Sequence, residues 1–227
     1  MFEVANEDVM YREMLMTNVN KESLDWAKQR GIEARGLMSY YNCAIREVET
    51  KLRVLDEEFS LHNDRNPINS IKTRLKSVPS IVEKCERRGL EVSIPTIEKE
   101  LNDIAGVRVV CSFVEDVYNL AEALLRQDDI TLIEKKDYIE NPKLNGYRSL
   151  HLIVEVPIFL EKEKRKMKVE IQLRTIAMDC WASLEHQLRY KKGFELTEDM
   201  QDELFKCALL CMKLDERMDD LRAGANI

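Results

Sequence analysis

The stretch KVEIQLR, residues 168–174, alternates between polar and apolar side chains. In a β-strand, successive side chains point to opposite faces of the sheet. One face of this strand therefore carries three aliphatic residues, and the other carries Glu170, Gln172 and Arg174. A solvent-facing sheet surface would explain the polar face, and so would a cleft that holds a metal-bound phosphate substrate. The pattern predicts a sheet with one packed face and leaves the role of the other face open.

Segments on both sides of this strand predict a small sheet covered by helices. Residues 107–113 and 150–156 are rich in β-branched and aliphatic side chains, which are typical of buried strands. Apolar spacing, prolines and glycines predict helices between Pro79 and Gly89 and over residues 96–102, 115–126 and 175–190. The mixture predicts an α+β core.

Both terminal regions are predicted to be helical. Apolar residues between Leu37 and Phe59 form one stripe of a long amphipathic helix, and a segment from about Glu7 to Arg30 would pair with it as a hairpin linked near Gly31 and Gly36. Residues 197–222 predict a helix with an acidic surface. These helices would serve self-association or pack on the chain's own sheet. We expect three regions: an N-terminal helical extension over 1–62, a core over 63–192 and a C-terminal helix over 193–227.

The composition is that of a globular protein. The chain has 227 residues, of which 44% are hydrophobic and 34% charged, with only seven glycines, so disordered and low-complexity classes are excluded. Its longest apolar run is too short and too polar for a membrane span, and its first ten residues do not form a secretory signal. The six cysteines include no Cys-x-x-Cys pair. We therefore expect a cytoplasmic protein with reduced cysteines and without a structural zinc.

Positive charge is concentrated in one segment of an acidic chain. The net charge is -7, yet residues 72–88 hold six basic residues against two acidic ones. The sequence predicts that these side chains lie on a short helix and the turn before it. A solvated helix face would explain them, and so would a site for a compact polyanion such as a nucleotide polyphosphate.

Asp103 is a candidate metal ligand. It precedes Gly106 and Arg108 at the start of a predicted strand, where glycine permits close backbone approach. Asp103 could simply end a helix. Paired with Glu170 it could hold Mg²⁺, which favours a few carboxylates together with substrate phosphates and water.

The loop over residues 138–149 combines an aromatic residue with cations. Tyr147 stands beside Lys143 and Arg148, and His151 follows at the start of the next strand. Such a loop can merely connect two strands, or it can stack on a base while its cations hold phosphates. With three histidines in the chain, a Cys/His or Ser/His/Asp catalytic set has little support, so metal-assisted phosphoryl chemistry is the better candidate.

Taken in order, these segments resemble the RelA/SpoT-type synthetases, especially the small single-domain alarmone synthetases. The motifs are RLKS (74–77), SIVEK (80–84), DIAGVR (103–108), DYI (137–139), PKLNGYRSLH (142–151), EIQLRT (170–175) and WASLEH (181–186). The sequences NPI (66–68) and PKLNGY (142–147) resemble the RelP-like branch slightly more than the RelQ-like branch. The family implies a nucleotidyltransferase-like mixed sheet with flanking helices.

The resemblance also implies a reaction and a distribution of roles. The family transfers the β,γ-pyrophosphate of ATP to the 3′-hydroxyl of GDP or GTP, giving ppGpp or pppGpp and AMP. Asp103 and Glu170 would be the catalytic pair and the Mg²⁺ ligands. The implied ATP-binding residues are Arg74, Lys76, Ser80, Lys84, Arg87 and Arg108. The implied residues for GDP or GTP are Lys143, Tyr147, His151, Gln172 and Asp179, with Tyr147 stacking on guanine.

Family members also suggest an assembly and a limit on activity. Relatives form homotetramers through their terminal helices, and regulation by single-stranded RNA has been suggested for some. Long relatives carry a hydrolase built around a His-Asp dipeptide, which does not occur here, so we expect synthesis without hydrolysis. Alternatives are another pyrophosphoryl or nucleotidyl transferase, a catalytically weak regulator that binds guanine nucleotides or RNA, and a structural helical oligomer.

Overall fold

The computed structural model describes residues 21–63, 65–189 and 196–225, and the side chains of residues 31–61, 65–189 and 196–224. Part of the predicted upstream helix, residues 7–20, lies outside the described residues. Two compact units are present, 1–39 and 40–227, and the sheet belongs to the second. The elements are α2 (Lys21–Asn63), β1 (Ile68–Leu75), α3 (Val78–Arg87), α4 (Ile94–Glu100), β2 (Ala105–Cys111), α5 (Val114–Leu125), β3 (Thr131–Asp137), β4 (Leu150–Phe159), β5 (Lys164–Thr175), α6 (Ile176–Arg189) and α7 (Glu198–Ala225).

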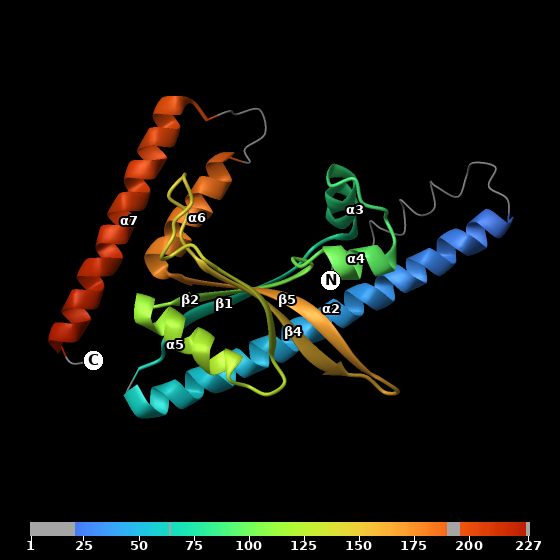
Figure 1. Ribbon diagram of the computed structural model, residues 1–227, viewed down its shortest axis with the longest axis horizontal. Coiled ribbons are helices and arrows are strands. Elements are labelled where there is room, and N and C mark those ends of the chain that lie inside the picture. Colours follow the sequence, from blue (N-terminus) through green and yellow to red (C-terminus); the bar gives the residue numbers. More distant parts are fainter. Residues whose placement is uncertain (1–20, 64, 190–195, 226–227) are drawn as a thin grey trace, which may run out of the picture. The chain divides into compact units, whose positions relative to one another are not determined.

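A five-stranded mixed sheet organises the second unit (Figure 1). Its strand order is β1-β2-β5-β4-β3, and only the β2–β5 pair is parallel. Helix α5 follows β2 along the chain, and β3 and β4 come before the chain returns to β5 beside β2. The predicted α+β fold with a mixed sheet and flanking helices is confirmed.

The apolar face of the sheet forms the core. Val169, Ile171 and Leu173 are fully buried, as the alternation of KVEIQLR predicts. From Tyr40 on, α2 lies along the same side of the sheet as α5 (Figure 1), and Lys51 of α2 reaches Asp129, just after α5, at 2.7 Å. Burying these aliphatic surfaces removes them from water and supplies most of the driving force for folding.

The predicted hairpin link in the N-terminal region is wrong. A single helix, α2, runs through Gly31 and Gly36 without a break. Glycine inside a helix costs only about 1 kcal/mol relative to alanine, and a helix of 43 residues tolerates two of them. The long apolar stripe predicted beyond Leu37 is confirmed for the part within the second unit, where Tyr41, Val48 and Leu52 are buried.

Two edge strands, β1 and β3, were not predicted from the sequence. Lys72 and Arg74 therefore lie on β1, and not on a turn before a helix; only Lys84, Arg87 and Arg88 of the basic segment lie on or directly after α3. Edge strands expose one side to water, so polar residues fill many of their positions and weaken the apolar alternation. Strand β1 places its cations beside β2, with Lys72 opposite Arg108 and Arg74 opposite Gly106.

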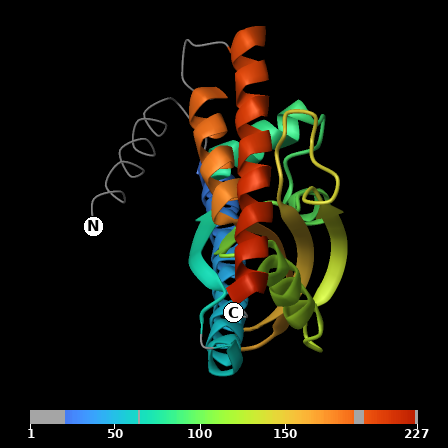
Figure 2. The ribbon, with the colours of Figure 1, turned by 90° about the vertical axis from the view of Figure 1, so that its left-hand side faces the viewer.

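Helices α6 and α7 run side by side at one end of the sheet (Figure 2). Trp181 and Ala182 of α6 pack with Ala208 of α7 in a small apolar cluster. The indole Nε1 of Trp181 donates a hydrogen bond to the Leu204 carbonyl at 2.8 Å. Helix α7 is thereby attached to the core through α6. None of the described helices is long and apolar enough to cross a bilayer.

Candidate active site

Register places the polar residues of three strands in rows across one face of the sheet. Gly106 lies opposite Glu170, and Arg108 lies opposite Gln172. His151 of β4 is the other neighbour of Gln172. Residues directly opposite each other share a face, so the polar face predicted for β5 continues over β2 and β4. A cavity of about 250 Å³ opens on this face between β1, β2 and β5.

Asp103 lies at the edge of this cavity between two ammonium groups. The Nζ atoms of Lys76 and Lys84 both lie 2.6 Å from its Oδ2. Burial raises the pKa of Asp103, but the two lysines outweigh it and hold the net pKa below its ordinary value. Burial in turn lowers the pKa of Lys84, although Asp103 opposes this. The cluster carries an ionised carboxylate within a positive surface that suits phosphate groups.

The second carboxylate, Glu170, is held by its neighbours on the sheet. Gln172 Nε2 donates to Glu170 Oε2 at 3.1 Å, and His151 Nδ1 lies 3.5 Å from Oε1. Burial and the charge of Asp103 raise the pKa of Glu170, but contacts with His151 and Gln172 outweigh them, so the net pKa is lowered. Glu170 is therefore ionised at neutral pH.

Asp103 and Glu170 fit a hard divalent cation. The Oδ1 atom of Asp103 is buried and accepts no hydrogen bond from any residue that the structure describes. A buried, ionised oxygen without a hydrogen-bond donor needs another partner, and a bound metal ion would supply one. In the described part of the chain no cluster offers three His, Cys, Asp or Glu ligands. Two carboxylates alone suit Mg²⁺, which keeps water and substrate oxygens in its remaining positions.

A ring of side-chain contacts joins Glu170 to the 138–149 loop, and all of its links are hydrogen bonds except the 3.5 Å contact between His151 Nδ1 and Glu170. Arg174 Nη2 donates to Gln172 Oε1 at 3.0 Å and to the Tyr147 hydroxyl at 2.7 Å. The Tyr147 hydroxyl lies 2.8 Å from His151 Nε2. Arginine can only donate, so in neutral His151 the phenol proton is directed to Nε2 and the Nδ1 proton faces Glu170. The ring fixes the orientation of Tyr147 relative to the carboxylate.

Aromatic rings and cations gather where the loop meets the sheet. Tyr138, Tyr147 and His151 contact one another edge to face, with ring centroids 5.3–6.0 Å apart. Lys143 Nζ lies 4.5 Å from the centroid of the Tyr138 ring and 4.8 Å from that of Tyr147. Such a group can stack on a base and hold an anionic substituent at the same time. This aromatic group and the two lysines that contact Asp103 lie on opposite sides of Glu170.

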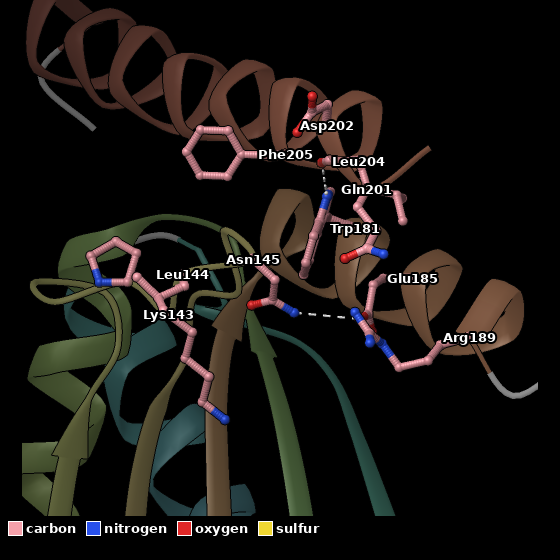
Figure 3. A pocket seen from close by; sticks show the side chains of 11 residues that line it. Lys143, Leu144, Asn145, Trp181, Glu185, Arg189, Gln201, Asp202, Leu204 and Phe205 are labelled. Carbon is pink, nitrogen blue, oxygen red and sulfur yellow. Dashed lines mark hydrogen bonds and ion pairs between the residues drawn. The ribbon is translucent and has the colours of Figure 1, made fainter. Parts of the chain in front are cut away.

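A larger cavity, of about 910 Å³, adjoins the same loop (Figure 3). It lies between residues 142–145 of the loop, α6 and the first turns of α7. Asn145 points across it toward Glu185, to which its Nδ2 donates at 3.4 Å (Figure 3). The smaller cavity is lined by both Asp103 and Glu170 and by Lys76, and is therefore the candidate active site.

Comparison with known proteins identifies the family. Residues 73–195 match the family profile described as the region found in RelA / SpoT proteins. The chain belongs to the RelA/SpoT family. It is 44% identical over 178 residues to the GTP pyrophosphokinase YwaC of Bacillus subtilis, covering 78% of this chain and 85% of that protein.

Solved structures of small RelA/SpoT synthetases share the fold. Small alarmone synthetase 2 from Bacillus subtilis superposes with a TM-score of 0.77 at 40% identity, covering 85% of this chain and 99% of that one. Small alarmone synthetase 1 from the same organism, bound to its product pppGpp, gives a TM-score of 0.77 at 34% identity, with coverage of 85% and 97%. The synthetase resemblance drawn from the sequence motifs is confirmed.

Not all residues predicted from the RelA/SpoT resemblance meet in one cavity. Arg74, Lys76, Asp103, Arg108, Glu170 and Gln172 line the smaller cavity together. The other predicted residues are not among the described residues that line it: Ser80, Lys84, Arg87, Lys143, Tyr147, His151 and Asp179. The Ser80 hydroxyl lies 2.9 Å from that of Ser77 at the first turn of α3, and Arg87 is exposed in the last turn. Both lie on the helix that carries Lys84.

Asp179 lies among cations. Its Oδ1 is 3.1 Å from Arg174 Nη1 and 3.4 Å from Arg108 Nη1, and its Oδ2 is 3.9 Å from Lys72 Nζ. The implied role of Asp179 on the guanine side stays a prediction. Its contacts join it both to Arg108, which the resemblance links to adenine, and to the ring of hydrogen bonds.

Two residues of the candidate site, Arg174 and Tyr138, were not predicted from the sequence. Arg174 was recognised as polar, but no role was predicted for it, although it is buried and bonded to three site residues. A buried guanidinium needs partners on several sides, and the alternation that places it beside Gln172 was the available signal. Tyr138 directly follows β3 and lies twelve residues before the start of β4, and the hairpin pairing of β3 with β4 brings it to Tyr147 and His151.

Proposed function

We propose that this chain is a GTP pyrophosphokinase, which transfers the β,γ-pyrophosphate of ATP to the 3′-hydroxyl of GDP or GTP and releases AMP. The observation that carries the proposal is the hydrogen-bonded ring from Glu170 to Tyr147, with Asp103 and its two lysines on the other side of the carboxylate. YwaC bears the same activity in its name, and synthetase 1 was solved with pppGpp bound.

The donor side of the proposed site is cationic. Lys76 and Lys84 would exchange part of their contact with Asp103 for contacts with the ATP phosphates. Ser80 and Arg87 on α3 would bind the same phosphates. Arg74 and Arg108 lie on neighbouring strands and would flank the adenine ring, since a guanidinium stacks on aromatic faces. Holding the polyphosphate in line with the acceptor accounts for most of the rate in phosphoryl transfer, because positioning and charge neutralisation dominate these reactions.

Asp103 and Glu170 would hold Mg²⁺ in this proposal. When bound, the ion would neutralise phosphate charge that develops during transfer. The support is the unpartnered, buried Oδ1 of Asp103 and the ionised state of both carboxylates. Cytoplasm, which supplies ATP, guanine nucleotides and Mg²⁺, is the proposed compartment.

The acceptor side orients one hydroxyl. Tyr147 would stack on guanine, and Lys143 would bind the phosphates of the nucleotide. Glu170 would accept the proton of the 3′-hydroxyl while His151 and Gln172 hold its carboxylate. The 3′-oxygen then forms a bond to the β-phosphorus of ATP, and the bond from that phosphorus to the oxygen bridging to the α-phosphate breaks, with AMP as the leaving group.

Product identification tests the proposed function. The purified chain is incubated with Mg²⁺, ATP and either GDP or GTP, and the nucleotides are separated by anion-exchange chromatography. We expect ppGpp from GDP, or pppGpp from GTP, and one AMP for each product, with none when either substrate is omitted. Binding of both nucleotides without product would refute the proposal. The 227 residues contain no His-Asp dipeptide, so purified ppGpp should remain intact in the same buffer.

Replacement of Tyr147 should weaken acceptor binding. Stacking of a base on an aromatic side chain is worth about 1–3 kcal/mol, so Tyr147→Ala should raise the KM for GDP by about tenfold to a hundredfold. The KM for ATP should change little. Tyr147→Phe is the matched variant, because it keeps the ring and removes only the hydroxyl that bonds to His151 and Arg174. An unchanged KM for GDP in Tyr147→Ala would exclude stacking.

We also propose a homotetramer formed through terminal helices. Helix α7 exposes Leu210, Leu214, Met218 and Leu221 at 65%, 52%, 43% and 66% of their surface, spaced along one side of the helix. Such a stripe suits a second copy of the chain. Light scattering should give four times the chain mass, and Leu210→Glu should reduce it. Glu216→Lys, an exposed change away from the stripe, should not. An unchanged mass in Leu210→Glu would exclude this surface.

A further inference from the structure

The 138–149 loop is attached to the C-terminal helix at two points. Gly146 of the loop contacts Ala208 of α7, and Arg148 of the loop binds Asp215, two helical turns further along α7. Tyr147 lies between these two anchors in the sequence. Helix α7 thus contacts the residue on each side of the proposed guanine-stacking ring.

The first anchor is a close backbone contact. Gly146 has φ +87°, in the left-handed region that favours glycine. A Cβ at this position would lie 2.4 Å from the Ala208 Cβ and 3.4 Å from Phe205 Cδ2. Both the absence of a side chain at residue 146 and the small side chain of Ala208 are therefore needed for the loop to reach α7.

The second anchor is a buried ion pair. Arg148 Nη1 donates to Asp215 Oδ2 at 2.8 Å, and only 11% and 6% of the two side chains are exposed. Burial raises the pKa of Asp215, although Thr175 at the end of β5 and Arg148 oppose this. Removal of one member of a buried pair leaves an uncompensated charge, so the loop cannot leave α7 without cost. Asp215 joins the loop, β5 and α7 at one point.

The ring of Tyr147 itself depends on these helices. It packs against the cluster of Trp181, Ala182 and Ala208, while its hydroxyl belongs to the ring of hydrogen bonds that reaches Glu170. Trp181 in turn is bonded to the Leu204 carbonyl of α7 (Figure 3). A shift of α7 would therefore move Tyr147 relative to the catalytic carboxylate. Within the described part of the chain, α7 supplies no residue to the smaller cavity, where ATP would bind.

We propose that α7 is a structural part of the acceptor site and that Arg148 and Asp215 are a positioning pair, which holds Tyr147 in the orientation that guanine nucleotides require. The inference rests on the proposed function, since it assigns the loop to the acceptor. Misplacement of a binding group by about 1 Å can cost about a hundredfold in rate. The pair should thus govern GDP use and leave ATP use nearly unchanged.

The test compares Asp215→Asn and Arg148→Lys with the wild type in full-length chains. Asp215→Asn keeps the shape of the side chain and removes its charge, whereas Arg148→Lys keeps the charge and alters the geometry. We expect Asp215→Asn to raise the KM for GDP about tenfold or more, Arg148→Lys to raise it less, and both to change the KM for ATP by less than about twofold. Asp220→Asn on the same helix is the control, since Asp220 is exposed.

Calorimetric binding of GDP and of a non-hydrolysable ATP analogue separates this inference from the proposed function. If the wild type makes no product, the proposed function is refuted. The positioning role is tested separately: Asp215→Asn should bind GDP more weakly than the wild type and should bind the ATP analogue with the same affinity. If Asp215→Asn loses affinity for GDP and for the ATP analogue equally, or if its affinity for GDP is unchanged, the positioning role is excluded. If circular dichroism shows that Asp215→Asn is unfolded, Arg148→Lys decides by the same comparison. The exchanged pair, Arg148→Asp with Asp215→Arg, should recover part of the GDP affinity lost in Asp215→Asn.

Discussion

Glu170→Gln is expected to lower kcat about a thousandfold while the melting temperature stays near that of the wild type. The amide has the shape of the carboxylate but can neither accept the proton of the 3′-hydroxyl nor give Mg²⁺ a charged oxygen. Loss of a general base alone costs about 10²–10⁴ in rate. The lowered pKa of Glu170 means that the wild-type residue is charged at neutral pH, so the substitution removes a full charge.

The matched control for this variant is Glu155→Gln. Glu155 lies on β4, on the same face as His151, and pairs with Lys166 at 3.2 Å outside the cavity. It undergoes the same chemical change without contact to the proposed substrates. Rates are measured at saturating ATP and GDP, and circular dichroism checks the fold. A Glu170→Gln enzyme within tenfold of the wild-type kcat would contradict the assigned role.

Asp103→Asn is expected to lower kcat about a hundredfold or more and to raise the Mg²⁺ concentration needed for half-maximal activity. The amide would leave Lys76 and Lys84 with two positive charges and no counter-charge, and it would remove one of the two proposed metal ligands. Removal of a single preorganised electrostatic group from an active site typically costs about 10²–10³ in kcat. The measurement is kcat as a function of Mg²⁺ concentration at fixed nucleotide.

Asp129→Asn provides the control for this second variant. Asp129 also pairs with a lysine, Lys51 at 2.7 Å, but in the contact between α2 and the end of α5. It should reduce stability slightly and leave the Mg²⁺ dependence unchanged. If Asp103→Asn needed no more Mg²⁺ than the wild type, Asp103 would be a partner of the lysines alone, and the metal assignment to it would fail.

Much of the sheet was predictable because burial imposes a pattern on the sequence. The alternation of residues 168–174 predicted which residues of β5 are buried, and the structure confirms it for Val169, Ile171 and Leu173. The same alternation placed Glu170, Gln172 and Arg174 together, where they form one side of the hydrogen-bonded ring. Central strands carry such patterns because one of their faces must exclude water.

The remainder of the site depends on pairings that a single segment does not encode. Strand β1 brings Arg74 opposite Gly106, and β3 places Tyr138 beside His151, but both are edge strands without a fully buried residue. The contact between Arg148 and Asp215 joins residues 67 positions apart. The sequence does not show that these two residues pair, because an exposed arginine or aspartate can form its hydrogen bonds with water instead. Only the packing of α7 buries the two together.

The fate of the two transferred phosphates distinguishes pyrophosphoryl transfer from other phosphoryl chemistry. ATP is labelled in separate reactions at the β- or at the γ-phosphate and incubated with GDP, Mg²⁺ and the wild-type chain. We expect both labels to appear in ppGpp in equal amounts and AMP to be unlabelled, because attack at the β-phosphorus transfers both groups together. Transfer of the γ-label alone would indicate an ordinary kinase, and attachment of the AMP moiety would indicate a nucleotidyltransferase; either result would contradict pyrophosphoryl transfer at Glu170.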